Sequence, residues 1–353
     1  LFQLGLCDGS DFSFPQGKKK RFELFRQAAE MGNSDAIMKL GRSSENGNVL
    51  VDEKKAIELF LQAADMGNTH AMVELGNWYM YGDVVPRDNK KAFELFQQAA
   101  DLGHTNAMNK LAICYDKGDG VTQDKAKAIQ LYQQAAHLGH TDSMVNLAVC
   151  YSQGDGVPQD KSKAFQLYQQ AADLGDPDAM VNLAVCYSKG DGVPQDKSKV
   201  FQLYQQASDL GNTDAMYYLG VCYEGGDGVA QDKSKAVQLY QQASDLGNTD
   251  AMNNLGHCYL EGDGVPRDKS KAIQLFQKAA DLGSAVAITN LGVHYMKGNG
   301  VPQDKSKAIQ LFQRASHLGN IDAMLFLAVC YSKGDCVPQD KFKAIQLLKQ
   351  AAE

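Results

Sequence analysis

The chain has 353 residues, a formal net charge of −7 at pH 7 and an isoelectric point of about 5.5. Acidic and basic residues are interspersed and form no basic stripe, so we expect no nucleic-acid partner. No apolar run approaches the roughly 18 residues that a membrane-spanning helix needs, so we expect no direct membrane insertion.

A repeat of 36 residues organises the whole sequence. From Ala71 onward one tyrosine in each copy marks the period, at Tyr79, Tyr115, Tyr151, Tyr187, Tyr223, Tyr259, Tyr295 and Tyr331. A fixed period of this length is typical of stacked supersecondary units that each contact only their neighbours. We therefore predict one all-α domain over residues 1–353, a right-handed superhelical solenoid of about ten helix-turn-helix repeats.

The first copy, residues 1–32, is degraded, and regular repeats occupy residues 33–353. Three consecutive lysines, residues 18–20, replace the usual glycines in the loop of the first copy. The second copy has a loop that is one residue shorter around Gly47. The chain opens without a methionine and partway into a repeat, so we expect it to be a segment of a longer protein.

The first helix of a repeat is expected over residues 141–153 and their counterparts. Asp or Asn precedes it in several copies and suits the N-cap, because its side chain can accept an otherwise unpaired backbone N–H. Gly154 and its copies are expected to end the helix in the left-handed conformation. Two residues further on, Gly156 is replaced by Val84 and by Cys336 in other copies. We therefore expect no positive φ at that second position.

The second helix is expected over residues 161–174, with Asp160 as its N-cap and Gly175 closing it. The connector between the helices, residues 154–160, contains glycines and carboxylates. Its spacing does not match the twelve-residue calcium loop of an EF-hand. We interpret the connector as a turn between helices and expect neither a metal nor another cofactor.

Helical periodicity assigns one side of each helix to the core. On the first helix the buried side comprises Ser143, Met144, Leu147, Ala148 and Tyr151. On the second helix it comprises Ala164, Leu167, Tyr168, Ala171 and Leu174. The outward residues of the second helix form a polar, solvated back, namely Gln166, Gln169, Gln170 and Asp173.

The outward face of the first helices is the candidate binding site, because its residues differ between copies whereas the packing positions agree. Valines recur there, asparagines border them, and two tyrosines and a histidine interrupt the pattern. Exposed apolar strips bordered by polar groups are typical of interaction sites. The alternative is that tightly stacked repeats bury these residues against one another. The candidates are Val145, Asn146, Val149, Val181, Asn182, Val185, Tyr217, Tyr218, Val221, Asn253, Asn254 and His257.

The repeat resembles the Sel-1-like repeat family, whose members are related to tetratricopeptide repeats and have a longer loop. In residues 141–176 the motif reads Met-Val-Asn-Leu-Ala-Val-Cys-Tyr, then Gly-Asp-Gly-Val-Pro-Gln-Asp, then Lys-Ala-Phe-Gln-Leu-Tyr-Gln-Gln-Ala-Ala. The resemblance covers essentially the whole chain, most weakly in residues 1–32. It implies an α-helical superhelix with first helices on its concave side, and a role as an adaptor that brings other proteins together.

Secreted, cysteine-rich members of that family link the two helices of a repeat by a disulfide, and this chain departs from the pattern. Its cysteines recur at one position of the first helix and are absent from the second helix. Equivalent helices of adjacent repeats lie about 8–10 Å apart, whereas a disulfide needs Cα atoms within about 7 Å. We therefore expect reduced, mostly buried cysteines and a cytoplasmic location. The recurring residues are Cys114, Cys150, Cys186, Cys222, Cys258 and Cys330.

Other candidate sites are weaker. His104, His137 and His140 could approach one another at one turn between repeats, but no carboxylate or thiolate ligand beside them is evident, so we expect no metal there. Asp155 and its copies are expected to be solvated rather than catalytic, since identical repeats give them identical environments.

These observations predict a non-enzymatic scaffold or adaptor that binds a protein or peptide in its concave groove. Two alternatives stay open. One is an accessory or regulatory module of an enzyme, or a weak hydrolase or metal-binding role, and the other is an extracytoplasmic carbohydrate-binding solenoid. The last helix carries Phe342 and Leu348 and lacks a polar capping helix, so we expect further chain or end-to-end self-association to cover it.

Overall fold

The computed structural model describes residues 33–37, 53–334 and 336–352. Helices account for the regular secondary structure in these residues, and no strand occurs among them. The degraded first copy, residues 1–32 with Cys7 among them, lies outside the described residues, as does the shortened loop near Gly47.

Two kinds of helix alternate along the described part of the chain. First helices begin after the turn between repeats, and they are α5 (Thr69–Tyr81), α7 (Thr105–Lys117), α9 (Thr141–Gln153), α11 (Pro177–Lys189), α13 (Thr213–Gly225), α15 (Thr249–Glu261), α17 (Ala285–Lys297) and α19 (Ile321–Lys333). Second helices follow the connector, and they are α4 (Glu53–Asp65), α6 (Asn89–Asp101), α8 (Lys125–His137), α10 (Lys161–Asp173), α12 (Lys197–Asp209), α14 (Lys233–Asp245), α16 (Lys269–Asp281), α18 (Lys305–His317) and α20 (Lys341–Gln350).

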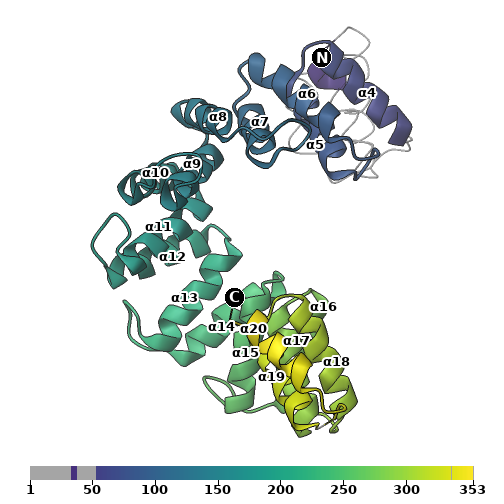
Figure 1. The fold of residues 1–353 in the computed structure, drawn as a ribbon. Helices are drawn as coiled ribbons and strands as arrows, with labels where there is room; N and C mark the ends of the chain where they lie inside the picture. The colour runs from purple at the N-terminus through teal and green to yellow at the C-terminus, as the bar shows by residue number, and fades with distance from the viewer. Residues whose placement is uncertain (1–32, 38–52, 335, 353) are drawn as a thin grey trace, which may run out of the picture. The chain divides into compact units, whose positions relative to one another are not determined.

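The chain divides into two compact units, Leu1–Leu174 and Gly175–Glu353. Within each unit the two helices of a repeat pack together, and the second helix also packs on the first helix of the next repeat (Figure 1). This arrangement confirms the predicted all-α solenoid of stacked helix pairs. The single domain over residues 1–353 and the right-handed superhelix stay predictions.

Side-chain caps and glycines set the bounds of the helices. Asp176 precedes α11 in an extended conformation, and its carboxylate accepts a hydrogen bond from the Ala179 N–H at 2.8 Å. Pro177 follows as the first helical residue, where a backbone N–H is not needed. Gly190 ends the helix at a φ of +78°. Asp160 caps α10 in the same way, so the predicted caps of both helices are confirmed.

Each tyrosine that marks the period joins the two helices of its repeat. The Tyr151 carbonyl accepts a hydrogen bond from the Asp160 N–H at 2.8 Å, which anchors the start of the second helix. The Lys163 ammonium lies 5.2 Å from the centre of the Tyr151 ring, within cation–π range. The same lysine–tyrosine pair recurs in the seven other repeats between Tyr79 and Tyr331, which explains why both residues keep the period.

The core of a repeat is formed where a ring on the second helix approaches a small residue on the first helix. Phe96 on α6 is fully buried, and a Cβ atom at Gly76 on α5 would lie 2.4 Å from its ring. Phe312 on α18 has the same relation to Gly292 on α17, at 2.5 Å. Glycine at these positions therefore lets the ring pack directly on the backbone of the first helix.

The leucine that follows each second helix does not belong to the core, and its predicted burial is wrong. Leu174 is 60% exposed, and its counterparts are exposed to a similar extent. The regular helix α10 ends at Asp173, and Leu174 is its C-cap. Helical periodicity therefore no longer applies at this residue. The buried residues of α10 are Ala164, Tyr168, Ala171 and Ala172.

In several repeats the aspartate of the connector links its repeat to the preceding one. Lys197 Nζ at the start of α12 lies 2.6 Å from Asp227 Oδ1 in the next connector. Lys125 and Asp155 form the equivalent ion pair two repeats earlier in the chain. Asp155 was expected to be solvated, and it remains partly exposed, but its main contact is this lysine.

The second glycine of the connector adopts a positive φ, contrary to the expectation drawn from its replacements. Gly156 has a φ of +71°, and Cys336 has a φ of +75° at the same position. Val84, the other replacement, does not share this conformation. At Gly120 a Cβ atom would lie 2.1 Å from the Asn89 carbonyl oxygen of the preceding repeat. Both the left-handed conformation and the close approach of two backbones favour glycine here.

Candidate functional site

In the second unit, the outward faces of α11, α13 and α15 carry nine of the twelve predicted site residues. Five of them are apolar or aromatic, and we call these five the valine–tyrosine strip. Tyr218 is 38% exposed, and the other members are half-buried. The strip is thus neither fully buried between repeats nor fully solvated, and part of its apolar surface is open to a ligand. Its members are Val181, Val185, Tyr217, Tyr218 and Val221.

Four tyrosines from α12, α13 and α14 form a cluster around the strip. The rings of Tyr204 and Tyr218 stack at 5.2 Å, and those of Tyr217 and Tyr218 lie 5.0 Å apart. Tyr217 also lies 5.9 Å from Tyr240, whose hydroxyl donates a hydrogen bond to Glu224 at 2.7 Å. These contacts hold the two outward tyrosines in defined orientations.

Burial raises the pKa of Tyr217, and the negative charge of Asp250 raises it further. A hydrogen bond with Asn254 acts in the opposite direction. The Tyr217 hydroxyl is therefore protonated at neutral pH and can both donate and accept hydrogen bonds. Asn254 belongs to α15, so this contact connects the tyrosine cluster to the next first helix.

The asparagines of the second unit differ in their availability. Asn182 Nδ2 donates to the Asp178 carbonyl of its own helix at 2.9 Å, and its side chain remains half-buried. Asn253 is only 4% exposed, and its amide donates to the Thr249 carbonyl at 2.9 Å and to Ser284 Oγ at 3.2 Å. Asn253 therefore does not border the open surface as predicted, because its side chain turns toward the next repeat.

His257 is exposed at the end of the predicted set. Its ring lies 5.3 Å from that of Phe276, and its Nε2 lies 3.4 Å from Asn290 Nδ2. Burial of part of the ring lowers the pKa of His257, and the neighbouring His294 lowers it further. The side chain is therefore neutral at pH 7 and titrates at more acidic pH.

The other three predicted residues lie on α9 in the first unit. Val145, Asn146 and Val149 are half-buried, and Asn146 Nδ2 donates to Asn109 Oδ1 of the preceding repeat at 3.0 Å. These three residues belong to the first unit, whereas the strip belongs to the second.

The cysteines of the first helices are buried thiols, as predicted for this position. Burial raises the pKa of Cys114 to about 12 and the pKa of Cys150 to about 11. Cys222 and Cys258 also have a pKa of about 11 for the same reason. Such thiols remain protonated at neutral pH and are poor nucleophiles. Cys336 is the exposed exception among the described cysteines.

The histidines group differently from the prediction. His104 packs on His70, with ring centres 4.7 Å apart, whereas His137 is exposed. His104 and His140 are both N-caps, and Nδ1 of each accepts a hydrogen bond from the helix that follows. No group of three or more potential metal ligands occurs among the described residues. His70 was missed because its repeat position is usually occupied by aspartate.

Sequence reasoning also missed two pockets at equivalent places in the repeat. One has a volume of about 280 Å³ and lies between α5, α6 and α7 in the first unit, lined by Met80, Tyr81, Arg87, Phe96, Lys110, Ile113, Lys117 and Asp119. The other, of about 170 Å³, lies between α17, α18 and α19 in the second unit, lined by Val293, Met296, Lys297, Phe312, Phe326, Val329, Cys330 and Lys333. One feature of the sequence could have indicated these pockets: Lys110 and Phe326 replace the asparagine that usually occupies this position of the outward face.

Stacked helix pairs with a constant core and a variable outward face define an α-helical solenoid repeat protein, a class generally used for protein–protein interaction. The Sel1 repeat pattern matches ten consecutive segments that cover the chain, residues 1–33, 34–68, 69–104, 105–140, 141–176, 177–212, 213–248, 249–284, 285–320 and 321–353. The chain therefore belongs to the Sel1 repeat family, whose scaffold is generally non-enzymatic.

Two solved structures resemble the chain along most of its length. A protective antigen present in uropathogenic Escherichia coli strains is 27% identical, with a TM-score of 0.62, and the match covers 94% of this chain and 79% of that one. A Sel1 repeat protein from Oxalobacter formigenes is 30% identical, with a TM-score of 0.60, and the match covers 92% of each chain. No curated protein matches the chain in sequence. Among the described helices, none combines the length and hydrophobicity needed to span a bilayer.

Proposed function

We propose that this chain is a non-enzymatic scaffold that binds a segment of another protein on the valine–tyrosine strip of its second unit. The observation that carries the proposal is the exposure of Tyr218, at 38%, on a cluster of four tyrosines that holds its ring in place. A side chain that is already ordered loses little conformational entropy on binding. Aromatic residues in such settings supply a large share of interface energy.

The proposed partner is an extended or helical peptide with apolar anchors. Val181, Val185 and Val221 offer apolar contact area beside the tyrosines. Asn182 and Asn254 border the strip, and their amide groups can pair with the backbone of a bound peptide. His257 is neutral at pH 7 and presents its ring beside them.

The protonated, buried thiols of the first helices support a structural role for the cysteines.

The test is quantitative capture of partner proteins from an extract of the source cells by two immobilised variants of the full chain. Tyr218→Ala and Val185→Asp change outward positions of α13 and α11. We expect either variant to weaken capture of the same specific proteins, by about thirtyfold in affinity for Tyr218→Ala, which corresponds to a loss of about 2 kcal/mol.

The matched controls are two single variants, Gln202→Ala and Gln206→Ala, which change exposed residues on the outer side of α12. Circular dichroism should show the same helix content in all four variants. Capture that survives at Tyr218→Ala and Val185→Asp but is lost in the α12 variants would assign binding to the second helices and refute the proposal.

A further inference from the structure

The pocket between α5, α6 and α7 combines a positive charge excess with an apolar wall, and we propose that it binds an acidic segment of a partner protein. Arg87, Lys110 and Lys117 line it together with a single carboxylate, Asp119. The local charge is therefore positive, although the whole chain carries a net charge of −7. The proposal rests on the protein-binding role proposed above but uses a surface in the other unit.

The three cations are not neutralised within the described part of the chain. No salt bridge joins Arg87, Lys110 or Lys117 to a carboxylate among the described residues. Each of them can therefore form a new ion pair without breaking an existing one. Lys110 is half-buried, so a carboxylate beside it would be less screened than one on an open surface.

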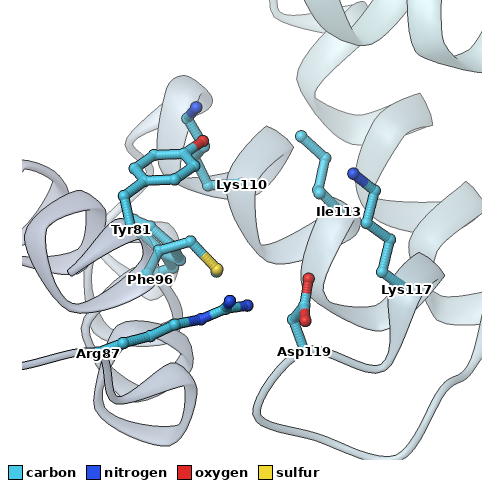
Figure 2. A pocket seen from close by; sticks show the side chains of 8 residues that line it. Tyr81, Arg87, Phe96, Lys110, Ile113, Lys117 and Asp119 are labelled. Atoms are coloured by element: carbon cyan, nitrogen blue, oxygen red, sulfur yellow. The ribbon is translucent and has the colours of Figure 1, made fainter. Parts of the chain in front are cut away.

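A hydrogen-bond relay fixes the guanidinium group. Arg87 Nε donates to Asn89 Oδ1 at 2.9 Å, and Asn89 Nδ2 donates to Asp119 Oδ1 at 3.1 Å. Figure 2 shows the Arg87 side chain extending across the pocket toward Asp119. The terminal nitrogens of Arg87 remain available as a fork that suits a carboxylate.

The spacing of the cations indicates more than one acidic group on the ligand. Lys110 and Lys117 are seven residues apart on α7, which corresponds to about 10 Å along the helix axis. Arg87 comes from the connector between α5 and α6. A ligand with two or more carboxylates could therefore pair with both lysines without drawing their side chains together. In an extended peptide, acidic residues two and four positions apart lie about 7 and 13 Å apart and bracket this spacing.

The rest of the pocket favours a peptide over a phosphate polymer. Met80, Tyr81 and Ile113 contribute apolar surface next to the cations, and Tyr81 is 61% exposed. Figure 2 places Tyr81 and Arg87 on one side, with Ile113, Lys117 and Asp119 on the other. An apolar side chain next to an acidic one would fill this arrangement, whereas a nucleic acid would need a longer basic stripe.

The equivalent pocket of the second unit supplies a matched control. Lys333 corresponds to Lys117, but Phe326 replaces Lys110, and Lys297 replaces Tyr81. The two pockets therefore share backbone and core while differing in the position and number of their cations.

The experiment measures binding of two fluorescein-labelled hexapeptides to the full chain by fluorescence anisotropy at low ionic strength. One peptide alternates Glu and Leu, and the other alternates Gln and Leu. We expect the Glu peptide to bind about tenfold more tightly and to lose that preference as salt is added, because exposed charge pairs are screened. The double variant Lys110→Gln and Lys117→Gln should abolish the preference, and Lys297→Gln with Lys333→Gln should retain it.

Three results would overturn the assignment: equal affinity for the two peptides, an undiminished preference in the Lys110 and Lys117 variant, or equal loss in both double variants. Binding of a DNA duplex that depends on Lys110 and Lys117, with no preference for the Glu peptide, would assign the pocket to nucleic acid instead. Tyr218→Ala should keep the preference for the Glu peptide. If partner capture depends on Tyr218 while the preference for the Glu peptide is absent, the binding role of the valine–tyrosine strip is supported and the assignment of this pocket is refuted.

Discussion

The pocket beside α7 and the pocket beside α19 lie six repeats apart in the sequence and occupy the same place in the repeat. Both are lined by a methionine and by a buried phenylalanine, Phe96 in one and Phe312 in the other. They differ at the outward positions, where Lys110 in the first pocket corresponds to Phe326 in the second. The repeat thus keeps the position of the pocket constant, whereas its volume and the chemistry of its lining vary.

This comparison separates two kinds of sequence position. Residues that face the core or the neighbouring backbone are restricted by packing and recur in both regions. Residues that face outward are not restricted by packing, so they can differ without changing the fold. Substitutions at positions that face the core or the neighbouring backbone should have similar effects in the two pocket regions, except where the space around the residue differs. Substitutions at positions that face outward should have different effects in the two regions.

The largest difference in stability is expected at the second connector glycine, Gly120 in the first region and Gly300 in the second. Their φ angles are similar, +75° and +79°, but a Cβ would lie 2.1 Å from the nearest atom at Gly120 and 3.2 Å at Gly300. Gly300→Ala should cost about 1–2 kcal/mol from the left-handed conformation alone. Gly120→Ala should cost about 2–4 kcal/mol, since backbone overlap adds to that strain.

Chemical unfolding followed by circular dichroism measures both variants. Cys336→Gly is the reverse control, because Cys336 has a φ of +75° at the same position, and it should stabilise the protein by about 1 kcal/mol. Equal losses at Gly120 and Gly300 would mean that conformation alone, and not the close approach of two repeats, selects glycine.

The next effect concerns the glycines beneath the buried rings. Alanine normally stabilises a helix interior relative to glycine by about 0.5–1 kcal/mol. At Gly76 and Gly292, however, the added Cβ would lie 2.4 and 2.5 Å from the ring of the second helix. We expect each Gly→Ala change to destabilise the protein by about 1–3 kcal/mol because the ring must move. The unfolding midpoint is the measurement, and it should shift similarly in the two regions.

Ala112→Gly is the matched control, since Ala112 occupies the same position one repeat after Gly76. This change should cost about 1 kcal/mol through helix propensity and lost contact. A gain in stability at Gly76→Ala or Gly292→Ala would contradict the packing argument.

The sequence was sufficient to predict the helices, their caps and most of the core, because each of these depends on local patterns repeated many times. The prediction was wrong where local geometry departs from the pattern. Leu174 follows the helical period but stands past the last helical turn. Cys336 suggested that glycine was optional at its position, whereas it adopts the glycine conformation.

The candidate sites could be predicted only in part, because they depend on contacts between repeats. Tyr217 and Tyr218 were visible as departures from the pattern, but their packing on Tyr204 and Tyr240 was not, since those tyrosines occupy ordinary core positions. The basic pocket was missed because Arg87, Lys110 and Lys117 belong to different positions of the motif. Only the folded repeat brings these positions to one pocket.

The smallest expected effect is a pH dependence at the N-cap of α7, which is a histidine, whereas the equivalent N-cap of α19 is Asn320. The Ala107 N–H donates a hydrogen bond to His104 Nδ1 at 3.2 Å, so this nitrogen must be unprotonated. Burial lowers the pKa of His104 below its ordinary value of 6.5, and His70 and His140 lower it further.

Below pH 6.5 the unfolded chain binds a proton at this histidine more readily than the folded chain does, so stability falls as the pH decreases. Protonation would also place a donor and a positive charge at the N-terminal end of a helix, where both are unfavourable. We therefore expect the wild-type protein to lose stability between pH 7.5 and pH 5. His104→Asn, which installs the cap found at α19, should reduce that loss by up to about 1 kcal/mol, the usual contribution of an N-cap. The measurement is the unfolding midpoint of both proteins at the two pH values. An unchanged pH dependence in His104→Asn would show that the cap at α7 does not titrate, and that the two regions differ in charge but not in their response to acid.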